Sequence, residues 1–345
     1  MTKLRELKAR FIEDPEFRKK CPRIDEEDAL IEALVRARKA AKLTQVDLAQ
    51  CLDTTHSTVA QLEGGEMSPL LATLRRYAEA AGMRLTVGFE RTDGFKDRLL
   101  AAAHPSWQSV LHDALGQLDT CFMECLRCCA SYWLPGPEKC LAAFTVPKEK
   151  VRVVWLGESP YPRRASATGL SFQDGSVDEL FRCDGRLSKN VNKATSLRAI
   201  LKAWFVATGR LDPRKTSTNN IQEMSKGGLI SKLPELFERG QEGGWMWLNA
   251  GLSLFPTGDE KDKRIQINEW KPFVEHVLQR LMEEAEPPTC VLAGDFARSF
   301  GNLGGSKVIS PVHPRLEKEF INDQAIRKFL DDWRCLIELG SPAQP

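Results

Sequence analysis

The first quarter of the chain has the hydrophobic periodicity of short helices. Four helices are predicted there, over residues 25–41, 45–52, 57–63 and 70–81. Thr44 is placed to cap the second of them, and Gly64 and Gly82 are placed to end the third and fourth. The tight turn at residues 53–55, between the second and third helices, has the spacing of a helix-turn-helix motif.

From His104 onward the pattern changes to short runs of continuous apolar residues. Strands are predicted at residues 151–156, 245–249, 289–293 and 307–310. Helical segments at residues 196–208, 269–284 and 296–300 separate them. Apolar strands that alternate with helices indicate an α/β fold with a parallel sheet that is covered on both faces.

These two patterns indicate two domains, for which a chain of 345 residues is long enough. Residues 1–90 are expected to form the helical domain and residues 104–345 the α/β domain. Residues 91–103 are expected to be a linker, because this segment begins RTDGFK and its Asp-Gly pair favours a turn.

The composition is that of a soluble globular protein, with 42% hydrophobic and 28% charged residues. No apolar run is long enough to span a bilayer, and the charged N-terminus lacks the apolar core of a signal peptide. We therefore expect a cytoplasmic protein with no membrane partner. The net charge of +2 hides a basic stretch, since residues 182–232 contain eleven basic and three acidic residues. Such a stretch can neutralise phosphates, although an ordinary solvated surface can have the same composition.

Ten cysteines are present, and five of them cluster at positions 121, 125, 128, 129 and 140. Cysteine clusters can hold zinc or iron–sulfur centres, but no histidine completes a zinc pattern here. The first four have helical spacing among Leu, Phe and Met residues, which is typical of small core residues. We expect no metal site and no cofactor.

Polar and aromatic residues follow the predicted strands where those strands end. Glu158, Ser159 and Tyr161 come after the first strand, Asn249 ends the second, and His313 follows the fourth. Because the carboxyl ends of parallel strands meet at one edge of a sheet, these side chains are expected to converge there. Each has an ordinary structural reading alone, and their common placement is what favours a functional site.

The helical domain contains LTQVDLAQCL, STVAQLEGGEMSP and LATLRRYAEAAGMRL, which resemble helix-turn-helix domains of the lambda-repressor type. With the preceding LRELKARFIEDPEFRKK, the whole segment is similar to antitoxins of the HigA type. The resemblance implies that Gln45 approaches the DNA backbone and that four residues face the major groove: His56, Ser57, Thr58 and Gln61. A unit retained for dimerisation or protein binding is the alternative, and a homodimer through this domain stays open.

The α/β domain resembles the uracil-DNA glycosylases. The matching blocks, in order, are PSWQSVL, VVWLGESPYPRRASATGLSF, SLRAI, WMWLNAGLSL, WKPFVEHVL and SPVHP. The resemblance implies a three-layer α/β fold with a central four-stranded parallel sheet. It also implies DNA as the partner, from which one nucleotide is flipped into the site.

The resemblance further implies a role for each strand-end residue. Phe172 would stack on the flipped base, and Asn249 would hydrogen-bond to the polar edge of that base. Tyr161 would pack against the base ring near its 5-position. His313 would stabilise the departing base anion as the catalytic hydrogen-bond donor. Ser196 would hold DNA phosphates.

The chain departs from the family pattern at the catalytic position. Ser159 replaces the family aspartate that holds the water and balances the cationic sugar, so that Glu158 becomes a candidate for the missing charge. Pro162 replaces the histidine after the family tyrosine. Leu316 is our candidate for the wedge that fills the vacated stack, with Arg315 as the runner-up.

Two functions of different class follow. The first is a DNA glycosylase that acts on a non-standard or modified pyrimidine, for example in phage DNA as antiviral defence. The second is a catalytically silent DNA-binding regulator that uses a glycosylase-like pocket as a sensor. The four matching residues at positions 161, 172, 249 and 313 favour activity, and Ser159 favours the sensor. An antitoxin fused to an effector is a third and weaker reading.

Overall fold

The computed structural model describes residues 26–64, 69–86, 94–217, 220–222, 228–255, 259–300 and 307–339. They form two compact units. Residues 26–86 belong to the first, and residues 95–126 and 130–339 belong to the second. None of the helices described combines the length and the apolarity that a membrane crossing requires.

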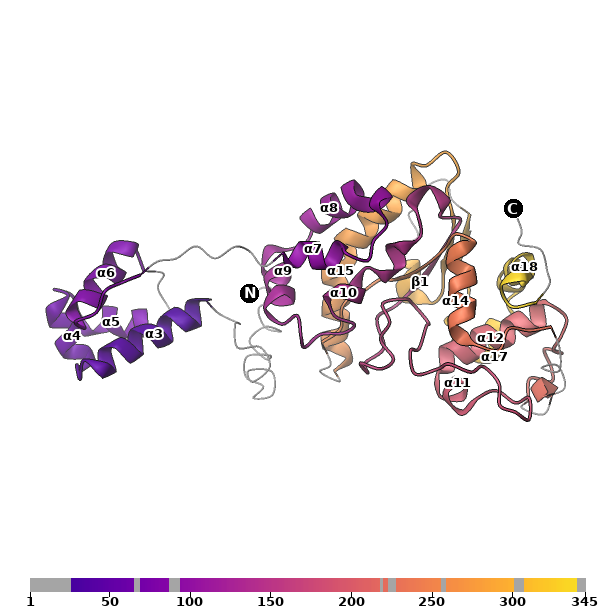
Figure 1. The fold of residues 1–345 in the computed structure, drawn as a ribbon, viewed down its shortest axis with the longest axis horizontal. Coiled ribbons are helices and arrows are strands. Elements are labelled where there is room, and N and C mark those ends of the chain that lie inside the picture. Colours follow the sequence, from indigo (N-terminus) through magenta and orange to yellow (C-terminus); the bar gives the residue numbers. More distant parts are fainter. Residues whose placement is uncertain are drawn as a thin grey trace. The chain divides into compact units, whose positions relative to one another are not determined.

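The described part of the first unit is helical, as predicted (Figure 1). Its helices are α3 (Glu26–Ala40), α4 (Gln45–Cys51), α5 (His56–Glu63) and α6 (Leu71–Ala80). Their apolar faces meet in one core that contains Leu34, Leu48, Leu52, Val59, Leu62 and Tyr77. The helix bounds lie within one residue of the predicted ones, because caps and apolar spacing determine short helices locally.

The predicted cap at Thr44 is confirmed. Its hydroxyl accepts a hydrogen bond from the backbone N–H of Asp47 (3.1 Å), and the Asp47 carboxylate accepts one from the Thr44 N–H (2.8 Å). This capping box satisfies backbone donors at the start of α4. The Thr55 hydroxyl caps α5 by accepting from the Thr58 N–H, and Asp53 takes a positive φ of 50° in the turn between the two helices. The turn therefore has the helix-turn-helix form that its spacing predicts.

The second unit is built on a four-stranded parallel sheet with the strand order β2-β1-β3-β4. The strands are β1 (Val153–Gly157), β2 (Trp245–Asn249), β3 (Thr289–Leu292) and β4 (Val308–Ile309). All residues of β1 and β2 are buried, as continuous apolar strands require. The predicted parallel sheet is confirmed.

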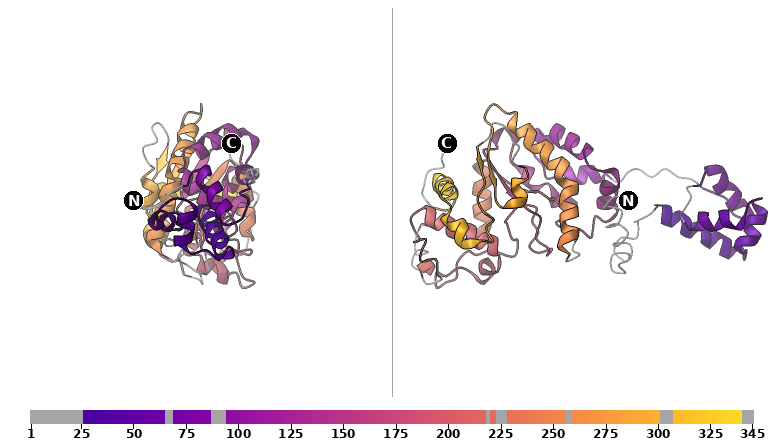
Figure 2. Two further views of the ribbon diagram at one scale, coloured as in Figure 1. Left: turned by 90° about the vertical axis from the view of Figure 1, so that its left-hand side faces the viewer. Right: turned by 180° about the vertical axis from the view of Figure 1, so that it is seen from behind.

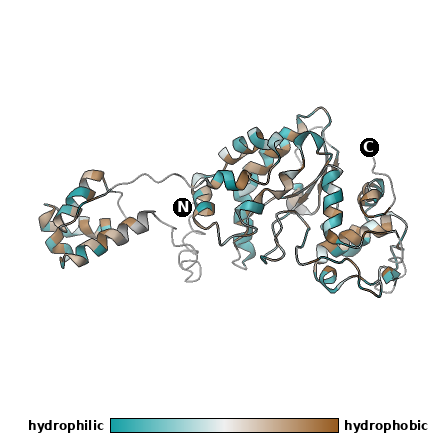
Figure 3. Cartoon of the chain, in the orientation of Figure 1, coloured by the Kyte–Doolittle hydropathy of each residue, from teal (hydrophilic) through white to brown (hydrophobic). Residues whose placement is uncertain are grey.

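Helices cover both faces of this sheet, which gives three layers (Figures 1 and 2). On one side lie α8 (Gln108–Gly116) and α15 (Glu260–Met282), and on the other lie α12 (Thr195–Ala207), α14 (Leu233–Glu242) and α18 (Gln324–Asp332). Figure 3 shows hydrophobic and hydrophilic residues alternating around the helices, as expected of helices that bury one side. Further helices of the described residues are α7 (Phe95–Leu100), α9 (Thr120–Cys128), α10 (Pro137–Cys140), α11 (Lys189–Lys193), α16 (Asp295–Arg298) and α17 (Glu317–Asn322). Short 3₁₀ segments lie at η1 (Pro105–Trp107), η2 (Ala142–Thr145), η3 (Lys148–Lys150) and η4 (Arg334–Leu336).

Tryptophan side chains fill much of the space beneath the sheet. The rings of Trp155 and Trp247 stack with centroids 5.6 Å apart and planes 18° apart, and Trp204 stacks on Trp245 at the same distance. All four side chains are buried. Large rigid rings in one cluster give the strand ends a firm base.

The linker expected at residues 91–103 is corrected in part. Residues 95–100 form α7, whose Phe95 and Leu99 side chains are buried in the second unit. These two residues are four apart and therefore share one face of the helix. Gly94, at a φ of 62°, precedes the helix, and residues 91–93 lie outside the described part of the chain.

Candidate active site

The carboxyl ends of the strands gather the residues that the sequence singled out. β1 ends at Gly157 and β2 at Asn249, and these two residues are direct neighbours in the strand register. β3 is followed by Gly294 and β4 by His313. Since the four strands are parallel, all of these positions lie at one edge of the sheet.

Gly157 marks the most tightly packed point of this edge. A Cβ atom placed on it would lie 2.7 Å from the Ser171 Cβ, 2.9 Å from the Asn249 Oδ1 and 3.6 Å from a ring carbon of Phe172. The amide of Asn249 and the ring of Phe172 are therefore brought together, as predicted, over a residue with no side chain. The absence of a side chain at position 157 is what lets them approach.

Asn249 is buried, and the backbone directly after it is tied to β1. The residue is only 2% exposed, and the Ala250 N–H donates to the Gly157 carbonyl (2.9 Å). A buried amide has a donor and an acceptor to satisfy, which makes Asn249 suited to pairing with a ligand that offers both.

Phe172 is positioned by a loop that folds back onto β1. The Ser171 hydroxyl donates to the Trp155 carbonyl (3.1 Å), and the Ser171 N–H donates to the Trp247 carbonyl (3.1 Å). Phe172 itself has a φ of 63°, a conformation that costs a residue with a side chain roughly 1 kcal/mol or more. Its half-buried ring meets Trp155 edge to face, with centroids 5.8 Å apart. Strain of this kind is typical of ligand sites, because the surroundings must enforce it.

The same loop carries Tyr161 close to Phe172. The Tyr161 hydroxyl lies 3.5 Å from the Phe172 carbonyl oxygen. Burial, and then the negative charge of Asp174, raise the pKa of Tyr161, so that the ring stays neutral. Asp174 is buried and accepts hydrogen bonds from Ser176 (2.6 Å) and from Arg163 (3.3 Å). These bonds hold the loop in a fixed conformation.

Ser159 lies in this loop and is half-buried. Among the described residues, no protein group is hydrogen-bonded to its hydroxyl. The hydroxyl therefore has its donor and its acceptor to offer to a ligand or to water.

Glu158 connects the strand end to two other segments. Its carboxylate pairs with Lys263 of α15 (3.3 Å) and more distantly with Arg315 (3.9 Å). Its backbone carbonyl accepts from the Gly251 N–H (2.9 Å), in the loop after Asn249. Glu158 is thus the carboxylate next to Ser159, and two cations face it.

His313 packs against the turn that ends β3. A Cβ on Gly294, whose φ is 90°, would lie 2.9 Å from the His313 Cβ and 3.0 Å from its Cδ2. Its Nδ1 accepts a hydrogen bond from the Arg315 N–H (3.0 Å), so that a neutral His313 carries its proton on Nε2. Burial, and then the charge of Arg315, lower the pKa of His313, which favours this neutral form. The imidazole is thereby prepared to donate a hydrogen bond from Nε2.

The residues expected to contact DNA are exposed or half-exposed. Leu316 is 53% exposed, which is unusual for a leucine in an ordered turn, and the Arg315 side chain is also exposed. Ser196 lies in the first turn of α12 and is half-buried. Of these residues, Arg315 faces Glu158 at the end of β1 (3.9 Å).

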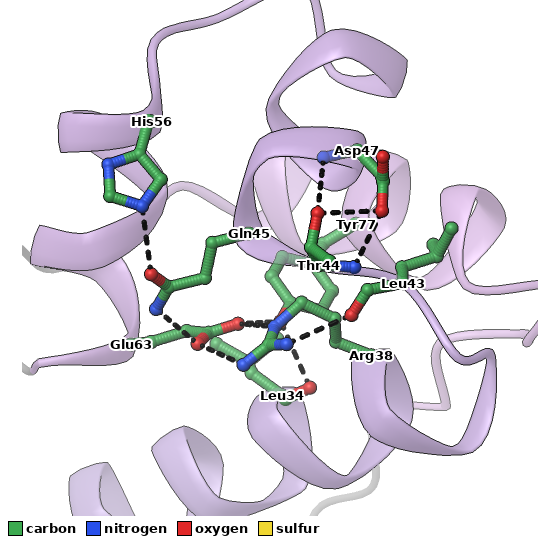
Figure 4. Close-up of polar contacts among 9 residues, drawn as sticks. All are labelled: Leu34, Arg38, Leu43, Thr44, Gln45, Asp47, His56, Glu63 and Tyr77. Atoms are coloured by element: carbon green, nitrogen blue, oxygen red, sulfur yellow. Dashed lines mark hydrogen bonds and ion pairs between the residues drawn. The ribbon is translucent and has the colours of Figure 1, made fainter.

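The helix-turn-helix residues belong to the other unit. His56, Ser57 and Gln61 are exposed on α5, as expected of a helix that reads bases, whereas Thr58 is half-buried and its hydroxyl lies 2.9 Å from that of Thr55. Gln45 lies between His56 and Glu63, with its Oε1 3.1 Å from the His56 Nε2 and its Nε2 donating to Glu63 (2.9 Å) (Figure 4).

Glu63 is the centre of a buried polar network in that unit (Figure 4). Its carboxylate accepts two hydrogen bonds from Arg38 (2.7 and 2.9 Å) and one from the Tyr77 hydroxyl (2.6 Å). Burial alone would raise the pKa of Glu63, but the hydrogen bonds from Arg38, Gln45 and Tyr77 outweigh it and lower the pKa to about 2. The network fixes α5 against α3, α4 and α6.

Sequence reasoning missed several residues that hold the site together. Lys263 and Glu317 act through partners that are more than a hundred residues away in the sequence, and no local pattern marks them. Arg163 pairs with Asp174 inside one loop, eleven residues away. Gly294, two residues after the end of β3, was an available signal for the packing of His313, because a glycine near a strand end often permits a close approach. The described residues include no group of three or more His, Cys, Asp or Glu side chains arranged to hold a metal ion.

Comparisons with known proteins agree with this fold. A uracil-DNA glycosylase from Corynebacterium efficiens is 34% identical over 242 residues, which cover 69% of this chain and 87% of that protein. A uracil-DNA glycosylase from Mycolicibacterium vanbaalenii is 30% identical over 183 residues, 53% of this chain and 66% of that protein. The crystal structure of the wild-type UNG from Nitratifractor salsuginis matches with a TM-score of 0.64 and 31% identity, over 72% of this chain and the whole of that one.

The first unit has its own relatives. Residues 34–87 match the helix-turn-helix family model. Antitoxin HigA1 from Mycobacterium tuberculosis is 35% identical over 77 residues, 22% of this chain and 52% of that protein. The three-layer sheet, the convergence at its carboxyl edge and these similarities together place the chain in the uracil-DNA glycosylase family, with a helix-turn-helix unit ahead of the family's fold.

Proposed function

We propose that the chain is a DNA glycosylase that flips a non-standard or modified pyrimidine out of DNA and hydrolyses its N-glycosidic bond. The observation that carries this proposal is the packing around Gly157, which sets the Phe172 ring beside the Asn249 amide at the edge that also holds His313. A flat apolar surface, a two-faced amide and a neutral imidazole donor match the needs of a flipped base.

The reaction follows from these groups. The base stacks on Phe172, and the Asn249 amide pairs with its polar edge. As the C1′–N bond breaks, its electron pair leaves with the base, and the His313 Nε2–H donates a hydrogen bond to the base oxygen that gains the charge. Water then adds its oxygen to C1′ and gives up a proton to solvent, and the base anion takes up a proton. The products are an abasic sugar and a neutral free base.

Ser159 and Glu158 divide the task of the family aspartate. The Ser159 hydroxyl is available to orient the attacking water, but it carries no charge. Glu158 is the neighbouring carboxylate, and its charge is the one that can balance a cationic sugar. Because Lys263 and Arg315 already face Glu158, this balance is weaker than that of a free carboxylate, which favours bases that leave readily.

The target base and its source are part of the proposal. A non-standard pyrimidine, such as those of phage DNA, suits this site. Because the site lacks the family aspartate, it depends on a base that leaves readily. Tyr161 beside Phe172 limits the 5-substituent to one that fits against its ring. The exposed polar residues of α5 and the family match support DNA binding by the helix-turn-helix unit as well.

The deciding experiment is a cleavage assay on duplex and single-stranded oligonucleotides that carry uracil or modified cytosines. Wild-type protein should leave abasic sites at one of these bases, which alkali converts into strand breaks. His313→Ala should lower the rate on the order of 10²- to 10³-fold, as loss of one preorganised donor does. His112→Ala, an exposed histidine on α8, is the matched control and should cleave like wild type.

The alternative is a silent sensor, and Ser159 is the observation that favours it. Intact strands across the whole panel of bases would support this reading. Under it, Asn249→Ala and His313→Ala would change the binding of DNA or of a free base, measured by calorimetry, and no product would form with any variant.

A further inference from the structure

Glu317 directly follows the exposed Leu316 and reaches across to a different helix. Its Oε2 accepts from the Arg198 Nε (2.9 Å), and its Oε1 accepts from the Lys202 Nζ (2.7 Å). Both partners lie on α12, whose first turn contains Ser196. One carboxylate therefore joins the segment after His313 to the helix expected to hold phosphates.

This connection is more substantial than an ordinary surface ion pair. The side chain of Glu317 is 23% exposed and that of Lys202 only 12%. Burial raises the pKa of Glu317, but the hydrogen bonds from Lys202 and Arg198 outweigh it and lower the pKa below its usual value, so that the carboxylate stays charged. Paired charges with several hydrogen bonds and little exposure hold their geometry well.

Arg198 extends the connection to a third segment. Its Nη1 donates to the Asn192 carbonyl (2.7 Å), close to the end of α11. The end of α11, the first half of α12 and the start of α17 are thus tied together through one arginine and one glutamate. In the sequence, α17 is more than a hundred residues away from α11 and α12, which directly follow one another.

Leu316 itself is anchored on both sides while its side chain faces solvent. The Leu316 N–H donates to the His313 carbonyl (2.8 Å), and the Leu316 carbonyl accepts from the N–H of Phe320 (2.9 Å), whose side chain is fully buried. An exposed apolar side chain on a rigid support has no role in the core, but it suits insertion between bases.

We infer that Glu317 is a positioning residue, which fixes the Leu316 wedge relative to the first turn of α12. A DNA strand whose phosphates lie at Ser196 then has Leu316 at the gap left by the flipped nucleotide. The inference rests on the proposed function, because it needs a DNA strand at this edge. Glu317, Arg198 and Lys202 thus couple the binding of the DNA strand to the displacement of its base.

The test measures DNA distortion without cleavage. The probe is a duplex that carries a stable tetrahydrofuran abasic analogue opposite 2-aminopurine, whose fluorescence rises when a wedge disturbs its stacking. Glu317→Gln should lose most of this rise and weaken binding by about tenfold, and Lys202→Gln should do so to a smaller degree. Glu319→Gln is the matched control on α17, because Glu319 is exposed and pairs with no basic side chain among the described residues. It should behave like wild type.

A double-mutant cycle separates positioning from a general loss of structure. If Glu317 acts through Leu316, then Glu317→Gln combined with Leu316→Ala should be no worse than Leu316→Ala alone. Additive effects, or a normal fluorescence rise with Glu317→Gln, would overturn the inference. If Glu317→Gln lowers the melting temperature by many degrees, Lys202→Gln, which leaves the Arg198 pair intact, decides the same question. Failure to cleave any base would count against the proposed function alone, because the fluorescence and the binding are measured on DNA that has no base to remove.

Discussion

At the residue scale, the candidate site depends on close backbone approach more than on side-chain contacts. A methyl group added at Gly157 would collide with Asn249, and one added at Gly294 would collide with His313. The tautomer of His313 depends on a backbone donor, the Arg315 N–H. Small changes at these positions should therefore alter the site with little change elsewhere.

The ionisation of His313 should set the acid limit of activity. Burial and the charge of Arg315 keep its pKa below 6.5, so the neutral donor should persist at pH values at which an ordinary histidine is protonated. The cleavage rate should fall only below pH 6.5. Arg315→Gln should shift this fall to higher pH, because it removes a positive charge that lowers the pKa of His313. The pH profile of single-turnover cleavage checks both expectations. If the rate of Arg315→Gln falls at the same pH as that of the wild type, the titrating group is not His313.

Gly157→Ala should damage the site directly. The added methyl group would meet Ser171 and the Asn249 amide at less than 3 Å, which should cost about 1–3 kcal/mol of unfolding free energy and displace the amide. Cleavage should fall more than stability. Gly116→Ala, at the end of α8, adds a methyl group that meets nothing within 4 Å and should leave both unchanged. Thermal unfolding and the cleavage rate measure the two effects, and equal behaviour of the two variants would contradict the packing argument.

At the element scale, local signals explain why some elements were predicted better than others. β2 lies at its predicted residues because the apolar run WMWL follows two glycines and ends at the polar Asn249. α15 begins at Glu260, nine residues before the predicted start at Glu269. Pro272 favoured a late start, because proline usually occupies the first turn of a helix, whereas this helix tolerates it in the interior.

The residues of the candidate site also differ in how well the sequence alone could place them. Phe172, Asn249 and His313 could be placed from the sequence, because each follows a strand and parallel strands share their carboxyl edge. The partners of Glu158 and Glu317 could not, since Lys263 and Arg198 lie more than a hundred residues away from them. Long-range ion pairs depend on how helices pack over the sheet, and no spacing along the chain encodes that.

α11 should contribute to DNA binding as an element. Lys189 and Lys193 are exposed, stand four residues apart on one helical face and have no acidic partner in the described part of the chain. Replacing both with Gln should reduce the slope of log K against log salt by about 2, if each contacts one phosphate. Lys307→Gln, at the amino end of β4, should not change the slope. Titrations at several salt concentrations measure it, and an unchanged slope for the double variant would remove α11 from the interface.

At the scale of the whole molecule, the chain consists of two units with separate cores. The first is organised around a charged network and the second around a sheet and its tryptophans. A substitution in one core should therefore leave the stability of the other unchanged, as expected for sites that share no packing partners.

Glu63 should make the first unit selectively sensitive to acid. Its pKa of about 2 lies below the usual 4.5, so its contribution of roughly 3 kcal/mol is present above pH 4.5 and is lost as the pH falls toward 2. Glu63→Gln should lower the melting transition of the first unit and remove much of this acid sensitivity, while the transition of the second unit stays in place. Glu79→Gln, exposed on α6, is the control. Calorimetry of the full chain tests this, and a shift of both transitions would show that the units unfold together.

The aromatic column below Phe172 gives the protein a built-in optical reporter. Phe172 touches Trp155, and Trp155 is stacked on Trp247. A heterocycle that settles on Phe172 changes the surroundings of these indoles within a few ångströms, so their ultraviolet emission should dim as the site fills. Occupancy by candidate nucleobases could then be followed in real time with unlabelled material.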